Sequence, residues 1–401
     1  MAAGEMEIIA PDRRKHHDEM TDLISKVFSH RGYFGFRDYC RDSYIDHSNY
    51  DWDASRIGLI GGRIVTHWGV WGYTMRIGTA RVKTGGIGVV ATHGDFRKRG
   101  LMDRTARASI QAMRDLGYDF SILFGIDDFY DRFGYVRAWS GVAYIVNVAD
   151  LPSEKPAARF VKFAPRHRDD LAAIYNRQYA TITGTAVRPT YLRNRRPDRW
   201  QGYLWSNARG AAQGYAIVSR DNTTLECIEA AGDAEQTLRV LAALCRRWGC
   251  HEVRFPDLQH ETPLARRLRR STCRMETYPR RCGGPMVRTL NLPAALDRMS
   301  AELSRRLRAS HLAGWRGRLL IADAREKAML AIGRSRARTL PPAVTTHTIR
   351  GSDQIAQLLI GTDEPDEVVE AGGIRLTGDA RKLIQVLFPN QHPQLGVWDS
   401  F

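Results

Sequence analysis

Residues 89–102 decide the fold of this chain, and they read VVATHGDFRKRGLM. An apolar, β-branched run ends in a basic turn that contains glycines, and a helical pattern starts directly after the turn. Such a turn directs backbone N–H groups and a helix N-terminus toward one point, an arrangement that binds anions. Arg97 and Arg99 add positive charge, and Gly100 has no Cβ to keep the backbone from a ligand. We therefore predict a site for an anion, such as a pyrophosphate, at this turn.

The residues after the turn predict a helix and then a strand. The apolar face of the helix carries Met102, Ala106, Ser109, Met113 and Leu116. Gly117 is expected to stop the helix, and a strand is expected over residues 118–124. An aromatic block at 129–135, FYDRFGY, follows this strand.

The turn and the aromatic block together resemble the acetyl-CoA site of the Gcn5-related N-acetyltransferase (GNAT) family. Arg97-x-x-Gly100 matches the start of the family's signature Arg/Gln-x-x-Gly-x-Gly/Ala, whereas Met102 replaces the small last residue. Met102 and the 129–135 block are similar to the enhanced intracellular survival (Eis) branch of that family. The resemblance implies acetyl-CoA as a co-substrate, bound by Val89, Val90, Arg97, Lys98, Arg99, Gly100 and Leu101.

Within this resemblance, Tyr130 is the candidate general acid. A neutral phenol, with an ordinary pKa of about 10, can protonate a departing thiolate. The alternative is that Tyr130 only packs beside Phe129 and Phe133. Tyr135 is a second candidate, although its place after Gly134 on an expected strand favours a role in the core.

The candidate general base is the α-carboxylate of Phe401. In the Eis branch the terminal carboxylate enters the site, and this chain ends VWDSF over residues 397–401. The alternative is a frayed terminus, as is common for chain ends. Asp127 and Asp128 are the next candidates for the base, and His93 is expected to lie beside the phosphates, far from the thioester.

The chain also repeats itself at the scale of a domain. The motif APDR at 10–13 precedes one helical stretch, and APRH at 164–167 precedes another. The two copies also end in similar segments, at residues 144–152 and 286–293. Where the second copy should carry the basic turn, residues 232–236 read GDAEQ, whose two carboxylates would repel a pyrophosphate.

We therefore predict an α/β (α+β) chain with mixed sheets flanked by helices. Its expected parts are a catalytic GNAT domain at 1–150, a degenerate second GNAT domain at 157–291 and a third domain at 294–401. In the Eis branch this last position holds a sterol-carrier-protein-like (SCP2-like) domain. Of the two copies, only the first is expected to bind CoA.

Composition sets further bounds on the protein. The formal net charge is +16, but no nucleic-acid-binding motif accompanies the arginine runs, which favours solvated helix faces. Six scattered cysteines predict free thiols in a reducing cytoplasm, and no signal peptide or membrane-spanning run is seen. No metal site is predicted, because no zinc spacing is formed by Cys245, Cys250, His251, Cys273 and Cys282.

The expected activity is transfer of acetyl from acetyl-CoA to a primary amine by direct attack in a ternary complex. The acceptor is left open among aminoglycoside-like compounds, polyamines and lysine side chains. A cationic acceptor would favour an acidic pocket, with candidates Asp38, Asp42, Asp46 and Asp399. The Eis resemblance also implies a hexamer. The alternatives are a lipid carrier that acts through the third domain and a basic nucleic-acid-binding module.

Overall fold

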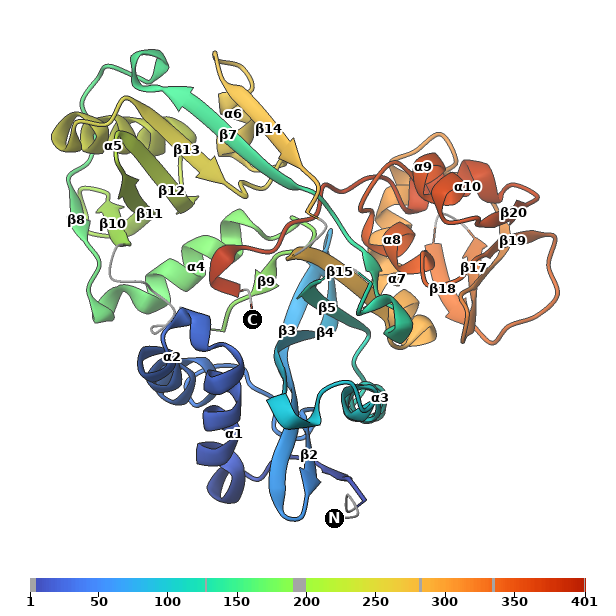
Figure 1. Ribbon diagram of the computed structural model, residues 1–401. Helices are drawn as coiled ribbons and strands as arrows, with labels where there is room; N and C mark the ends of the chain where they lie inside the picture. The colour runs from blue at the N-terminus through green and yellow to red at the C-terminus, as the bar shows by residue number, and fades with distance from the viewer. Residues whose placement is uncertain (1–4, 127, 190–199, 281–282, 334–335, 400) are drawn as a thin grey trace.

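The computed structural model describes residues 5–126, 128–189, 200–280, 283–333, 336–399 and 401, without the side chain of Asp42. Three β-sheets, each accompanied by helices, make up this part of the chain (Figure 1). The mixed α/β class predicted from the sequence is confirmed.

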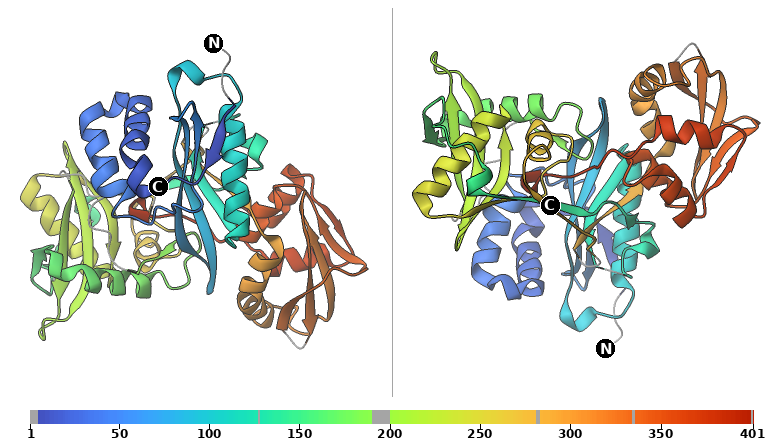
Figure 2. Two further views of the ribbon diagram at one scale, coloured as in Figure 1. Left: turned by 90° about the horizontal axis from the view of Figure 1, so that it is seen from below. Right: turned by 90° about the horizontal axis from the view of Figure 1, so that it is seen from above.

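The first sheet lies at the centre of the molecule. Its strands, in spatial order, are β1 (Glu7–Ile9), β2 (Arg56–Ile60), β3 (Arg63–Ile77), β4 (Ala80–Thr92), β5 (Phe120–Gly125), β15 (Gly284–Thr289) and β6 (Val136–Arg137), and β9 (Ala186–Val187) pairs with β3. One face carries α1 (Arg13–Val27), α2 (Tyr33–Tyr39) and the π-helical turn η2 (Cys40–Ile45). The other face carries α3 (Leu101–Asp115), as two views of the ribbon show (Figure 2).

The second sheet lies beside the first. Its strands, in spatial order, are β8 (Phe160–Lys162), β10 (Gln201–Ser206), β11 (Ala212–Asp221), β12 (Thr224–Ala231), β13 (Glu252–Pro256), β7 (Gly141–Asn147) and β14 (Arg274–Tyr278). Its helices are α4 (Arg168–Gln178), α5 (Ala234–Trp248) and α6 (Pro263–Leu268). Short 3₁₀ turns are η1 (Ser29–Arg31), η3 (Gly94–Phe96), η4 (Asp131–Phe133), η5 (Val148–Asp150), η6 (Pro165–His167) and η7 (Val397–Asp399).

The two sheets repeat one topology, as the duplicated sequence predicts. In the first, β3 and β4 are antiparallel and β4 and β5 are parallel; β11, β12 and β13 follow the same pattern in the second. The helices α3 and α5 form the corresponding crossovers between the parallel strands.

The copies also exchange strands: β9 of the second copy pairs with β3 in the first sheet. β15 of the second copy pairs with β5 and β6 in the first sheet, and β7 of the first copy pairs with β13 and β14 in the second sheet. The division into domains at 150 and 157 stays a prediction, but the sheets do not follow it. The two copies are therefore joined by the backbone hydrogen bonds of three exchanged strands, β7, β9 and β15.

A third unit follows β15. Its sheet has the order β18 (Arg336–Leu340), β17 (Lys327–Gly333), β16 (Gly317–Ala322), β19 (His347–Arg350) and β20 (Arg375–Thr377), and its helices are α7 (Leu292–Arg308), α8 (Ile355–Ile360), α9 (Pro365–Ala371) and α10 (Ala380–Leu387). Leu296, Leu303 and Leu307 of α7 share one apolar cluster with Met75 and Val82 of the first sheet. Among the helices of the described residues, none is long and apolar enough to cross a bilayer.

The helix predicted after the basic turn is present as α3. Met102, Ala106, Ser109 and Met113 are buried along one face, whereas Leu116 follows the last helical residue and is 39% exposed. The prediction was wrong for Leu116 because the helix ends one residue before it. After α10, the chain returns toward the centre, so that the C-terminus lies near the first sheet (Figure 1).

The exchanged strands change what a fragment should do. Residues 1–150 alone would leave β5 without β15 and would leave β7 without a sheet, which exposes unpaired strand edges. We expect this fragment to lack a cooperative thermal transition by circular dichroism, and co-expression with residues 151–401 to restore it. A cooperative transition of the isolated fragment would contradict this expectation.

Candidate active site

The first sheet opens at one point. β4 and β5 pair in parallel from Thr84 to Ile87, where the pairing ends. A bulge follows, in which Val89 and Val90 oppose a single residue of β3, and the φ of Val89 is +41°. A β-branched residue at positive φ is strained by about 1–3 kcal/mol. The backbone at 88–90 therefore leaves β5, and the N–H groups expected to contact a thioester lie at this opening.

His67 helps to hold the bulge. Its Nδ1 lies 2.9 Å from the carbonyl oxygen of Val89, and its Nε2 lies 2.8 Å from the hydroxyl of Tyr50. Burial lowers the pKa of His67 to about 4, with the hydrogen bond to Val89 opposing the shift. His67 is therefore neutral at pH 7. The bulge is fixed by packing and by a neutral hydrogen bond.

A basic pocket lies where α3 begins. Its cavity is about 510 Å³, and its cationic lining residues are Arg97, Lys98, Arg99 and Arg132. Arg132 lies 3.3 Å from Asp103, which also lines the pocket. Gly100 directly precedes α3 with a φ of +69°, so the turn requires glycine for its backbone conformation as well as for access. Four cations at a helix N-terminus suit a phosphate-rich ligand.

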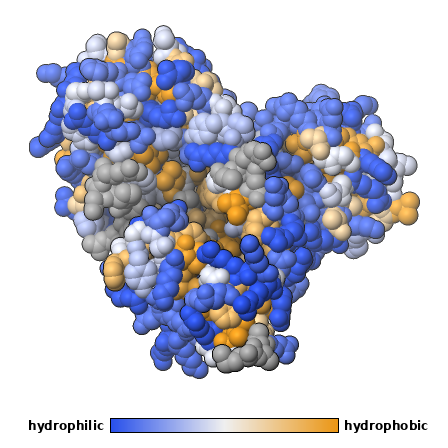
Figure 3. Space-filling model, in the orientation of Figure 1, coloured by the Kyte–Doolittle hydropathy of each residue, from blue (hydrophilic) through white to orange (hydrophobic). Residues whose placement is uncertain are grey.

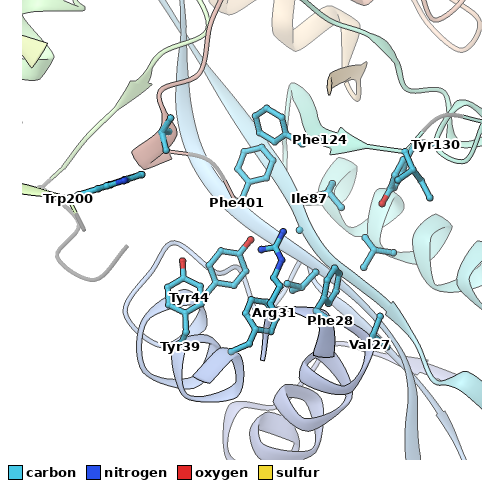
Figure 4. Close-up of a pocket in the computed structure, with 16 residues that line it drawn as sticks. Val27, Phe28, Arg31, Tyr39, Tyr44, Ile87, Phe124, Tyr130, Trp200 and Phe401 are labelled. Carbon is cyan, nitrogen blue, oxygen red and sulfur yellow. The ribbon is translucent and has the colours of Figure 1, made fainter. Parts of the chain in front are cut away.

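An aromatic pocket adjoins the basic pocket. Its cavity is about 540 Å³, and both pockets are lined by Val27, Val90, Ile126 and Tyr130. Its other lining residues are Phe28 after α1, Trp200 before β10, and residues of η1, α2, η2, β4, β5 and the C-terminal tail, and Figure 4 shows several of them facing one another. In the space-filling view, apolar residues surround a hollow at the centre of this face (Figure 3). The two pockets together form one candidate site.

Tyr130 lies where the two pockets meet. Its ring packs on Trp68, with the centroids 6.0 Å apart, and on Phe129, at 4.8 Å. Burial raises the pKa of Tyr130 to about 12, so its phenol is protonated at neutral pH. Tyr135 is buried in the core, and its hydroxyl lies 2.7 Å from Ser121. The tyrosine at the pockets is therefore Tyr130.

Phe401 reaches the aromatic pocket from the opposite end of the chain. Its ring lies 5.7 Å from Phe124 and 5.9 Å from Tyr73, measured between centroids. A Cβ placed on Gly88 would lie 3.0 Å from the carboxyl carbon of Phe401 and 2.8 Å from the hydroxyl of Tyr44. The terminal carboxyl group therefore lies against the bulged strand, and the tail is docked.

A buried ion cluster holds the tail two residues before its end. Arg188 donates to Asp399 from Nε and Nη2, both at 2.8 Å, and to Glu229 from Nη1 at 2.9 Å and Nη2 at 2.7 Å. The hydroxyls of Tyr175 and Tyr215 donate to Asp399 and Glu229 at 3.1 and 2.6 Å. All three charged side chains are at most 6% exposed. We call these three charged residues the tail cluster.

The charges of the tail cluster compensate one another. Burial alone would lower the pKa of Arg188, but Asp399 and Glu229 raise it well above its ordinary value. The guanidinium also lies 3.5 Å from the ring centroid of Tyr175, a cation–π contact. Arg188 follows β9, Glu229 lies on β12 and Asp399 lies in η7, so the cluster ties the second copy to the tail.

Several expected residues lie elsewhere. Asp399 was predicted as a lining residue for a cationic acceptor, but its carboxylate is bound by Arg188. Asp46 pairs with Arg13 and His17, and Asp38 pairs with Arg41. None of these three carboxylates lines the aromatic pocket.

Asp128 and His93 do not line the pockets either. Asp128 is exposed and lines neither pocket. His93 caps η3, and its Nε2 contacts Arg63 at 2.6 Å. Asp127 and Cys282 lie outside the described residues, as does the side chain of Asp42. Within the described residues, no group of three His, Cys, Asp or Glu side chains could hold a metal ion.

Two functional features escaped the sequence prediction. Arg132 lines the basic pocket and lies inside the aromatic block at 129–135. Its position three residues after Phe129 was the sequence signal that could have placed it there. No local signal marked Arg188, because its partners lie 41 and 211 residues away along the chain.

Comparison with known proteins agrees with this geometry. Residues 9–138 match the acetyltransferase (GNAT) domain family, and the search of curated proteins finds no match. The matched domain, which in this family uses acetyl-CoA, makes the chain an acyltransferase enzyme.

The whole chain is similar to several solved structures. A GCN5-related N-acetyltransferase from Anabaena variabilis has a TM-score of 0.78 at 14% identity, covering 99% of this chain and 100% of that one. A probable N-acyltransferase from Enterococcus faecalis has a TM-score of 0.74 at 16% identity, with coverage of 99% and 100%. Eis1 from Mycobacterium abscessus has a TM-score of 0.70 at 14% identity, also with coverage of 99% and 100%. These likenesses show a shared fold over all three units.

The tail cluster can be tested by the release of the last residue. Asp399→Ala removes the acceptor of two hydrogen bonds from buried Arg188, which costs about 1–3 kcal/mol, while Glu229 still accepts from Nη1 and Nη2. We expect carboxypeptidase A to remove Phe401 faster from this variant than from the wild type, as followed by mass spectrometry. Asp366→Ala, which breaks an exposed pair with Arg381, is the control and should leave the rate unchanged. Equal rates for all three proteins would show that the cluster does not hold the tail.

Proposed function

We propose that this chain transfers an acetyl group from acetyl-CoA to a primary amine by direct attack in a ternary complex. One observation carries the proposal: a basic pocket and an aromatic pocket meet at Val90 and Tyr130, and the chain terminus at Phe401 lines the second. The first pocket suits the phosphates of the donor, and the second suits the acceptor. The reacting atoms would then meet between Tyr130 and Phe401.

The donor would be held by charge and by backbone groups. Arg97, Lys98, Arg99 and Arg132 supply cations for the phosphates, and the N-terminus of α3 supplies N–H groups. The backbone N–H groups at 89 and 90, freed from β5 by the bulge, would contact the pantetheine arm and polarise the thioester oxygen.

The proposed chemistry uses two protein groups. The amine nitrogen attacks the thioester carbon, so that a C–N bond forms and the C–S bond breaks. The α-carboxylate of Phe401 takes the proton that the amine loses, directly or through water, and Tyr130 gives its phenolic proton to the departing thiolate. The two protons can then exchange through solvent, which restores both groups. Because burial raises the pKa of Tyr130, the phenol carries its proton at neutral pH and has it available when the thiolate forms.

Further properties belong to the proposal through the family resemblance. They are a hexameric assembly and an SCP2-like third unit, which sedimentation analysis and lipid-binding assays would test. Free thiols at Cys40, Cys227, Cys245, Cys250 and Cys273 support a reducing cytoplasmic compartment.

The basic pocket predicts a defect in donor binding. Arg97→Ala with Arg99→Ala removes two phosphate contacts, each worth about 1.5–3 kcal/mol if charge-assisted. The Kd for acetyl-CoA should rise by about tenfold or more in calorimetry, with the fold intact. The control is Arg246→Ala with Arg247→Ala, two exposed residues in the last turn of α5, the corresponding helix of the second copy. Unchanged affinity in the first variant would refute the assignment of the phosphate site.

Tyr130→Phe tests the proposed general acid. The ring packing stays, but the proton is lost, so kcat should fall by about 10²–10⁴-fold while acetyl-CoA still binds. Tyr135→Phe is the matched control, because Ser121 keeps its hydrogen bond to the carbonyl of Gly85 at 2.9 Å. Full activity of Tyr130→Phe would leave this tyrosine with a packing role only.

A further inference from the structure

We propose that the acceptor is a primary monoamine with an aromatic body, and that Arg31 discriminates against polycations. This inference rests on the proposed acetyltransfer. It restricts the class of acceptor amines on the basis of the residues that line the aromatic pocket. This lining differs from the acidic pocket that an aminoglycoside or a polyamine would favour.

The acceptor side of the pocket is built from aromatic rings. The rings apart from those of Tyr130 and Phe401 belong to Phe28, Phe36, Tyr39, Tyr44, Phe124 and Trp200. An aromatic acceptor can pack on such walls in offset or edge-to-face geometry. The faces of the same rings attract an ammonium group.

The rings are held in place by their neighbours. Tyr39 stacks on Tyr44 with 5.5 Å between the centroids, and Tyr44 lies 4.6 Å from Trp71. The indole of Trp71 donates to the carbonyl of Tyr44 at 2.9 Å. The π-helical turn that carries Tyr44 is thus fastened to β3. A wall fixed in this way loses little side-chain freedom when a ligand binds.

The charges of the pocket distinguish one cation from several. Among the described lining residues, no side chain is a carboxylate, and the negative charge comes from the terminus at Phe401. One ammonium beside this terminus, ready to react, is therefore compensated. A second ammonium on the same molecule would meet no described carboxylate in the pocket.

The positive charge of Arg31 would also repel a second ammonium group. It is exposed, with its guanidinium 5.7 Å from the ring centroid of Phe36. In Figure 4 the guanidinium points into the space between Tyr44 and Phe401. The additional charges of a polyamine or an aminoglycoside would approach this cation in a half-enclosed site, where like charges repel more strongly than in bulk water.

The test compares three acceptors with the full-length protein. kcat/KM is measured for 2-phenylethylamine, spermidine and kanamycin, with acetyl-CoA as donor and detection of the free thiol. We expect 2-phenylethylamine to be preferred over both polycations by about tenfold or more. In Arg31→Glu, the ratio of spermidine to 2-phenylethylamine should rise by about tenfold or more, at an unchanged KM for acetyl-CoA.

Arg14→Glu is the matched control. It makes the same change of net charge, on an exposed residue in the first turn of α1 and outside the pocket lining, where a carboxylate suits the helix dipole. Its acceptor ratio should equal that of the wild type. Preference of the wild type for spermidine or kanamycin, or an unchanged ratio in Arg31→Glu, would overturn the acceptor assignment. Absence of transfer to all three amines would instead overturn the proposed function.

Discussion

The site depends on one buried interaction, the hydrogen-bonded ion pairs of Arg188 with Asp399 and Glu229. Transferring a guanidinium from water into the protein interior costs free energy, and this cost is offset only where carboxylates and hydrogen bonds surround the group. Here two carboxylates and the ring of Tyr175 do so. Because Asp399 stands two residues before the end of the chain, this cluster fixes where the terminal carboxylate lies. A site on the first sheet thus receives a group that is held largely by the second copy.

This arrangement gives the second copy a physical role. It lacks the basic turn, and Asp233 instead caps α5 by accepting from the amide of Gln236. What it keeps is the sheet that carries Glu229 and the helix that carries Tyr175. The exchange of β7 and β15 ties that sheet to the first one through the backbone. Loss of its own basic turn therefore leaves its structural contribution intact.

Local patterns allowed much of the site to be predicted from the sequence. The strand, the basic turn and α3 follow one another within 89–115, and the periodicity of buried residues and the glycine at position 100 mark them directly. The duplicated topology was visible for a related reason, since the two copies preserve similar order and similar ends. The docking of Phe401 followed from the family resemblance, to which the aromatic tail was the visible match.

The features that could not be predicted depend on contacts between distant residues. The exchange of β7 and β15 has no signature, because a strand has the same alternating pattern whichever sheet it joins. Asp399 was a candidate for the acceptor pocket because a cationic acceptor would favour carboxylates there, and only the fold brings Arg188 to it. Arg31 and the rings around it likewise meet only once α1, α2 and the tail are assembled.

A short extension of the chain tests the proposal that the α-carboxylate of Phe401 acts as the base. Three glycines added after Phe401 move the charge away while the ring can still pack on Phe124 and Tyr73. If this carboxylate is the base, kcat should fall by about 10²-fold or more, with the melting temperature and the Kd for acetyl-CoA near those of the wild type. Acetylation by the extended protein at the normal rate would show that the terminal carboxylate is not the base.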